Sequence, residues 1–139
     1  MSKEIDLLLI ERDISITLFN YAKACDQKNW LLLDEVFHES AIAIYGDPNG
    51  YQCNGLNEIK SFLSESLKTI GDAQHLLTNI QIEVKEHNAL ATSYLSALQM
   101  SIGSNPKPSQ VWGKYNDTLV KDNGLWKIVR KELKIFFSK

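Results

Sequence analysis

The sequence predicts an α+β domain in which N-terminal helices cover one face of a strongly bent antiparallel sheet, with an interior pocket between the two layers. Apolar residues recur at helical spacing in the first half of the chain, and after Gln74 their period changes to two. Asn123-Gly124 gives a strong signal for a tight hairpin. With 139 residues, of which 44% are apolar, the chain has enough core for one domain, and we expect this domain to span residues 1–139.

Three helices are expected in the first half of the chain. Residues 5–25 carry Ile, Leu and Phe side chains at helical spacing, with no Gly or Pro between them. Asn29 is suited to cap a short second helix that extends to residue 37. Residues 57–70 place apolar side chains at i, i+3, i+4 and i+7, the pattern of a helix that lays one face on a sheet, and Gly71 ends this helix.

Strands are expected from the middle of the chain onward. Residues 41–45 predict a short strand, closed by a turn at Asp47-Pro48-Asn49-Gly50. From Gln74 apolar and polar residues alternate, which predicts a four-stranded antiparallel meander. Its first turn is expected at His87-Asn88. The three strands after that turn are expected at residues 89–102, 111–121 and 125–137.

The last strand places a cation in an apolar row. Strand alternation puts Lys131 on one face together with Leu125, Val129, Leu133, Ile135 and Phe137. Two interpretations stay open at this point. The lysine can extend to the rim, where its ammonium group is solvated, or it can face the cavity and stabilise a developing negative charge.

Composition excludes several classes of function. The 15 basic and 17 acidic residues are interspersed, so we expect no nucleic-acid partner. The apolar run near the N-terminus is too short for a signal peptide or a membrane span, so we expect a cytoplasmic protein without membrane contact. Cys25 and Cys53 lack the number and spacing of a disulfide framework or a zinc site, and both are expected to be reduced thiols.

One pair of residues predicts chemistry. His75 and Asp26 would form a general base and the group that orients it, if the fold brings them together. The structural alternatives are that His75 is a hydrogen-bonded residue at the start of a strand and that Asp26 terminates the first helix. Tyr21 and Tyr115 would either donate hydrogen bonds to a ligand or be core aromatics with tethered hydroxyl groups.

Four short motifs occur in the order and spacing of a known family. They are Tyr21-x4-Asp26, His75-x3-Asn79, Gly113-x-Tyr115-x-Asp117 and Asn123-Gly-x-Trp126. Over nearly the whole chain they resemble the SnoaL-like branch of the nuclear transport factor two-like superfamily, which includes scytalone dehydratase, bile acid dehydratases and hexachlorocyclohexane dehydrochlorinase. The resemblance implies a cone-shaped, cystatin-like domain with an interior pocket, a His-Asp dyad in its enzymes, no metal or other cofactor, and frequent dimers or trimers.

The resemblance also assigns roles to individual residues. It implies a catalytic set of Asp26, His75, Tyr21 and Lys131, with Arg130 beside the lysine. The ligand-binding set that it implies is Ile70, Leu98, Val111, Tyr115 and Leu133. The implied reaction is loss of water, or isomerisation, by His-Asp proton abstraction from a small apolar cyclic compound such as a steroid or a polyketide.

Two alternative functions and a homo-oligomeric state are also expected. The main alternative is a non-catalytic module that binds a small ligand or acts like a dioxygenase β subunit. Epoxide hydrolysis ranks last, because it usually needs an Asp-Arg-Asp array. We expect a homodimer or homotrimer, since the sheet face without helices should carry Trp112, Trp126 and Ile128, which a second copy would shield from water.

Overall fold

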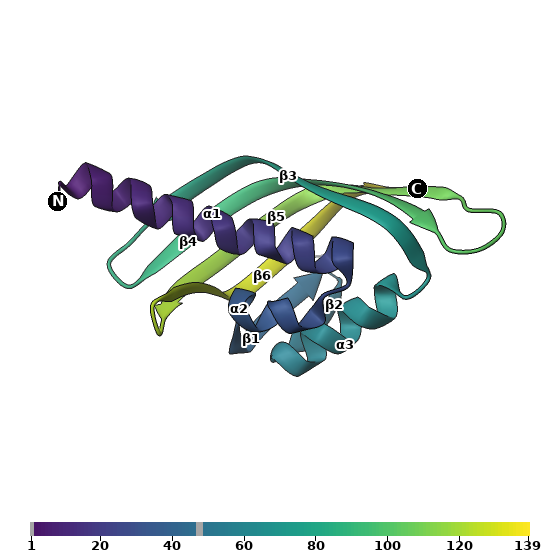
Figure 1. Cartoon of the computed structure of the whole chain (residues 1–139). Helices are drawn as coiled ribbons and strands as arrows, with labels where there is room; N and C mark the ends of the chain where they lie inside the picture. The colour runs from purple at the N-terminus through teal and green to yellow at the C-terminus, as the bar shows by residue number, and fades with distance from the viewer. Residues whose placement is uncertain (1, 47–48) are drawn as a thin grey trace.

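The structure, a computed structural model, describes residues 2–46 and 49–139. The helices in this part of the chain are α1 (Lys3–Gln27), a 3-10 helix (Trp30–Leu32), α2 (Leu33–Val36) and α3 (Leu56–Leu67). The strands are β1 (Phe37–Tyr45), β2 (Tyr51–Asn54), β3 (Ile70–Val84), β4 (Asn88–Ser101), β5 (Pro108–Asp122) and β6 (Leu125–Ser138). Figure 1 shows the helices on one face of a bent, open sheet, which confirms the predicted α+β class. Within the described ranges, no helix has both the length and the apolar character that crossing a membrane requires.

The sheet has the strand order β2-β1-β6-β5-β4-β3. Strands β3 to β6 form the predicted antiparallel meander, and β1 and β2 form an antiparallel pair. The pairing of β1 with β6 is parallel, which the sequence did not predict. Parallel neighbours need a long connection, and here α3 and the other strands of the meander lie between the two. Local sequence patterns carry no signal for a partner that is so distant in the chain.

Several element boundaries differ from the predicted ones. The second helix is shorter than expected because Phe37 already pairs with Ile128 in the sheet. Strand β3 begins at Ile70, before the change of hydrophobic period at Gln74. Strand β2 was not predicted, and Asp47-Pro48 of the expected turn lies outside the described residues.

The long helix α1 is fixed at both ends and near its middle. The Ser2 side chain accepts a hydrogen bond from the backbone N–H of Ile5 (3.2 Å) and caps the N-terminus. At the other end Lys28 adopts a left-handed conformation (φ 54°), which stops the helix. Thr17 Oγ1 donates to the backbone carbonyl of Trp126 (2.6 Å) and ties α1 to β6. The C-terminal turn of α1 is therefore held in a fixed place over the sheet (Figure 1).

A bulge in β3 reverses the alternation of its side chains. The register with β4 shifts between Thr78 and Gln81, and Asn79 has a positive φ of 52°. On simple alternation His75 would lie opposite the apolar row that includes Ile80. The extra residue brings both His75 and Ile80 to the half-buried, helix-covered face. Simple alternation therefore fails in β3, because it continues only while the register is unbroken.

A second bulge, in β6, explains why two further predictions are wrong. Thr118 pairs with Arg130 and Leu119 pairs with Ile128, so Val129 is the extra residue. Trp126 and Ile128 are buried under the helices, at 8% and 0% exposure, and do not lie on the uncovered face. Leu125 is 49% exposed and does not share the buried face of Lys131, although Leu133 does. Trp112, at 51% exposure, does lie on the uncovered face.

Candidate functional site

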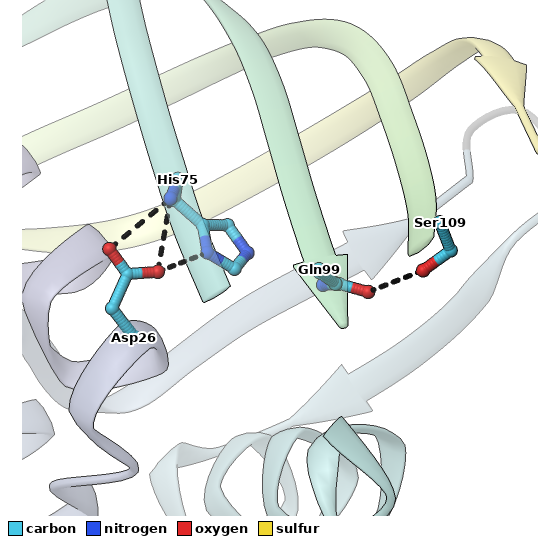
Figure 2. Close-up of polar contacts among 4 residues, drawn as sticks. All are labelled: Asp26, His75, Gln99 and Ser109. Atoms are coloured by element: carbon cyan, nitrogen blue, oxygen red, sulfur yellow. Dashed lines mark hydrogen bonds and ion pairs between the residues drawn. The ribbon is translucent and has the colours of Figure 1, made fainter. Parts of the chain in front are cut away.

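Asp26 and His75 are in direct contact. Asp26 lies in the last turn of α1, and His75 lies on the covered face of β3. Asp26 Oδ1 is 2.6 Å from His75 Nδ1. The backbone N–H of His75 also donates to both carboxylate oxygens, at 3.0 and 3.2 Å (Figure 2). The ring bond and the backbone bonds together fix both the carboxylate and the imidazole.

This geometry selects one tautomer of the imidazole. A carboxylate at Nδ1 favours the form in which Nδ1 carries the hydrogen, which leaves the lone pair on Nε2. The His75 side chain is 9% exposed and the Asp26 side chain 25%. His75 therefore has little contact with water, and Asp26 stands ready to stabilise the imidazolium ion if Nε2 accepts a proton.

His75 lines a cavity between the sheet and helices α1 and α3. The cavity has a volume of about 290 Å³. Most of its wall is apolar or aromatic, and polar groups come from His75, Gln99, Ser66, Cys25 and three tyrosines. The lining residues are Tyr21, Cys25, Tyr45, Phe62, Leu63, Ser66, Leu67, His75, Leu95, Ala97, Gln99, Val111, Tyr115, Leu133 and Ile135. An apolar cavity with a few converging polar groups is the usual form of a small-molecule site.

Two tyrosine hydroxyl groups meet in the wall of this cavity. Tyr21 Oη and Tyr45 Oη are 2.8 Å apart. Burial is the main reason that the pKa of each phenol lies well above its ordinary value. Both groups therefore keep their hydrogens at neutral pH. One hydrogen is used between the two oxygens, which leaves one hydroxyl hydrogen of the pair for another acceptor.

Lys131 takes neither of the two positions expected from the sequence. Its ammonium group lies 3.1 and 3.3 Å from the carboxylate oxygens of Asp117, and both residues are almost completely buried. It also lies over the rings of Tyr21 and Tyr115, 4.2 and 3.7 Å from their centroids. Lys131 does not line the cavity. It is buried and not at the rim, and it packs on two aromatic rings of the cavity wall.

Burial and charge pairing shift the pKa values of Lys131 and Asp117 in opposite directions. Burial lowers the pKa of Lys131 and raises that of Asp117, because each charge loses its hydration. The partner charge offsets part of each effect. Asp117 belongs to the Gly113-x-Tyr115-x-Asp117 motif, but its pairing with Lys131 was not predicted. Arg130, the neighbour of Lys131, is exposed and pairs with Glu132 at 2.6 Å, so it does not face the cavity.

The expected ligand-binding residues divide into two groups. Val111, Tyr115 and Leu133 line the cavity as expected. Leu98 does not: it is 47% exposed on the opposite face of β4, because alternation turns its neighbours Ala97 and Gln99 inward.

Ile70 is also absent from the cavity wall. It begins β3, where its carbonyl oxygen accepts a hydrogen bond from the Lys28 ammonium group, and Leu67 of α3 supplies the lining instead. The prediction fails here because residue 70 was expected inside a helix that in fact ends at Leu67.

Tyr45 and Gln99 also line the cavity, although neither was predicted to. Gln99 follows Leu98 in β4, so correct alternation would have found it. Ser109 Oγ lies 3.4 Å from Gln99 Oε1, and Figure 2 shows the amide oxygen directed toward Ser109 and away from His75. Tyr45 ends the predicted first strand, and only the tertiary contact with Tyr21 indicates its role. Among the described residues, no group of three or more His, Cys, Asp or Glu is placed to hold a metal ion.

Comparison with known proteins identifies the family of this chain. The sequence profile of the SnoaL-like domain matches residues 6–132. The chain belongs to the SnoaL-like family. No curated protein sequence matches it.

Solved structures of related proteins show the same fold. A proposed scytalone dehydratase from Novosphingobium aromaticivorans is 27% identical, with a TM-score of 0.85 over 95% of this chain and 87% of that one. A type 2 hexachlorocyclohexane dehydrochlorinase is 14% identical, with a TM-score of 0.85 over 99% and 92% of the two chains. A nuclear transport factor 2-like protein from Salmonella enterica is 18% identical, with a TM-score of 0.82 over 93% and 92%. Two of these three structures are named as a dehydratase and a dehydrochlorinase.

Proposed function

We propose that this SnoaL-like protein is a lyase of the dehydratase type, or an isomerase, that acts on a small apolar cyclic compound. One observation carries the proposal: Asp26 holds His75 at 2.6 Å, and His75 lines an apolar cavity. A His-Asp pair in such a place is equipped to move a proton. The two relatives named for elimination reactions support the same class.

The mechanism uses the free nitrogen of His75. Nε2 removes a proton from a carbon atom next to a carbonyl group, and Asp26 stabilises the resulting imidazolium ion. The electron pair of the broken C–H bond forms a C=C bond, and the hydroxyl group on the next carbon leaves. The imidazolium ion returns the proton to this group, so the products are an unsaturated compound and water. In an isomerisation the same proton returns to another carbon.

The tyrosine pair supplies the second polar contact. The hydroxyl hydrogen that Tyr21 and Tyr45 do not share would bind the carbonyl oxygen of the substrate and stabilise the negative charge that develops there. Tyr115, on the same wall, supports the site through its edge contact with the Tyr21 ring (5.8 Å between centroids). We assign no direct catalytic contact to Lys131, because its ammonium group is paired with Asp117 and does not line the cavity.

A non-catalytic ligand-binding module is the second candidate. The backbone hydrogen bonds from His75 to Asp26 favour it, since they join α1 to β3 whether or not the ring reacts. Epoxide hydrolysis has less support, because Arg130 points to solvent and pairs with Glu132.

Two substitutions separate the candidates. Activity would be assayed on cyclic hydroxy-carbonyl compounds by the absorbance of the conjugated product. His75→Ala should lower the rate by about 10²- to 10⁴-fold. Asp26→Asn should also lower it, because the amide can support the wrong tautomer.

The control is the fold of each variant, monitored by circular dichroism. If both folded variants keep the full wild-type rate on a compound that the protein converts, the dyad is structural. If they also still bind that compound, the binding module is the better description.

We also propose that the protein assembles through the outer face of its sheet. Exposed aromatic and apolar side chains lie there on neighbouring strands, among them Tyr94, Leu98, Trp112 and Phe136. Trp112 and Phe136 pack edge to face, with 5.5 Å between ring centroids. A second copy on this face would shield these side chains from water.

A further inference from the structure

The cavity that His75 lines, called the inner cavity from here on, has a second hollow beside it. This hollow, the outer groove, is lined by Tyr51, Glu58, Ser61, Phe62, Glu65 and Ser66 and has a volume of about 530 Å³. Phe62 and Ser66 of α3 also line the inner cavity. The two spaces are therefore separated at this point by side chains of one helix.

Three stacked aromatic rings cross the boundary between the two spaces. The Phe62 ring lies 4.7 Å from the Tyr45 ring and 5.0 Å from the Tyr51 ring, with interplanar angles of 14° and 12°. Tyr45 lines the inner cavity, and Tyr51 lines the outer groove. Phe62 lies between them. Its ring is thus the main partition, and the much smaller Ser66 completes it.

The volume of the inner cavity limits what it can hold. Pockets for drug-sized ligands measure about 300–1000 Å³, and the inner cavity, at about 290 Å³, is just below this range. A compound of one or two rings fits such a space. A compound of four fused rings would have to displace part of the wall.

Phe62 is the wall residue whose side chain can be replaced with the least disturbance to the fold. Elsewhere the wall is formed by hydrogen-bonded strands of the sheet, by the buried core face of α1, and by the buried Leu63 and Leu67 of α3. Phe62 is half-buried, and open space lies on its far side. Removing its ring would join the cavity to existing space without breaking the sheet.

We infer that Phe62 sets the ligand size of this protein. It restricts the inner cavity to compact ring compounds, and a smaller side chain at this position admits compounds of four fused rings that extend into the outer groove. This inference rests on the proposed function, because it takes the inner cavity as the ligand site.

The test compares two probes of different size. Binding of 2-naphthol (two rings) and 1-hydroxypyrene (four rings) would be followed by fluorescence titration. The wild-type protein should bind 2-naphthol and bind 1-hydroxypyrene much more weakly. Phe62→Ala should increase the affinity for 1-hydroxypyrene by about tenfold or more, the range in which pocket sterics discriminate, and change that for 2-naphthol much less. Phe62→Leu removes less volume, and it replaces Phe62→Ala in the same titrations if the alanine variant does not fold.

Tyr51→Ala is the matched control, because Tyr51 lines the outer groove but not the inner cavity. It should leave the ratio of the two affinities unchanged. If 2-naphthol binds but neither Phe62 variant improves binding of 1-hydroxypyrene, the inference about Phe62 is wrong and the proposed function stands. The same holds if Tyr51→Ala gives an equal gain. If the wild-type protein binds neither probe, the inner cavity is not a ligand site for ring compounds, and both proposals are overturned.

Discussion

At the scale of single residues, the buried ion pair of Lys131 and Asp117 is expected to affect the stability of the protein more than its activity. A pair taken out of water pays a desolvation penalty that its mutual attraction only partly offsets. Loss of one partner is worse than loss of both, since it leaves an isolated charge in the core. Lys131 also packs on the rings of Tyr21 and Tyr115, which adds cation–π contacts to the ion pair.

We predict that Lys131→Met alone lowers the free energy of unfolding by about 3–5 kcal/mol. The double variant Asp117→Asn/Lys131→Met should lose much less, because it leaves no unpaired charge. Urea denaturation at pH 7 measures both values. The double variant should also keep most of the activity, since Lys131 does not line the cavity. Equal destabilisation by the single and double changes would contradict this account.

The buried thiol of Cys25 predicts how stability depends on pH. Burial raises the pKa of Cys25 to about 12, from an ordinary value of 9.0. Between these values the thiol is ionised in the unfolded chain but still protonated in the fold, so the unfolded state binds fewer protons. The free energy of unfolding must then fall as the pH rises from about 9 toward about 12.

Cys25→Ser removes this titration with little change of shape. We predict that wild-type stability decreases between pH 9 and pH 11 and that the decrease is shallower in Cys25→Ser. Denaturant unfolding at several pH values gives the two slopes. Identical slopes would show that the Cys25 thiol does not contribute, and would assign the decrease to other buried groups such as Tyr21.

At the scale of elements, bulges decide which residues reach the site. The Asn123-Gly124 turn was predicted correctly, and a regular hairpin from this turn would pair Asp117 with Arg130. The bulge at Val129 pairs Asp117 with Lys131 instead. One extra residue thus creates the buried ion pair. It also turns Trp126 and Ile128 toward the helices.

The elements themselves were largely predictable because their signals are local. Hydrophobic period and turn residues predicted α1, α3 and the meander to within a few residues. The contact between Asp26 and His75 was anticipated through a family resemblance, and not from spacing alone. A bulge leaves no regular period, so Leu125 was assigned to the wrong face. The position of Tyr45 in the cavity depends on packing between distant elements, which no local pattern encodes.

Gly113 shows why β5 and β6 depart from regular pairing. A Cβ atom at this position would overlap the carbonyl oxygen of Lys134 and lie 3.3 Å from Ile135 Cα. The register of the two strands shifts at this point. Only glycine permits this close approach of the backbones.

We predict that Gly113→Ala lowers the free energy of unfolding by about 1–3 kcal/mol, the usual range for overpacking. Gly71→Ala, in β3, is the control, because its added Cβ would make only ordinary contacts at 3.6 Å. It should change stability by no more than about 0.5 kcal/mol. Chemical denaturation of the two variants measures the difference. If both variants lower the free energy of unfolding by the same amount, the backbones of β5 and β6 do not approach closely at Gly113 in solution.

At the scale of the whole molecule, the accessible surface is larger than that of a typical monomer of this mass. The accessible area of 8274 Å² exceeds the value of about 7300 Å² expected for a folded monomer of this mass. The excess is comparable to the area of about 800 Å² that one partner buries in an interface of standard size. Exposed side chains gather on the outer sheet face, around Trp112 and Phe136.

We therefore predict a dimer or trimer at micromolar concentration in sedimentation experiments, and dissociation of this assembly by Trp112→Glu. A charge at the centre of an apolar contact would be buried without a partner, which association cannot offset. Phe19→Glu on α1 is the matched control: Phe19 is 50% exposed and Trp112 is 51% exposed, but they lie on different surfaces. If Phe19→Glu dissociates the assembly and Trp112→Glu does not, the interface is formed by the helical side. A wild-type monomer at this concentration would leave the outer face free and require another explanation for its exposed aromatic residues.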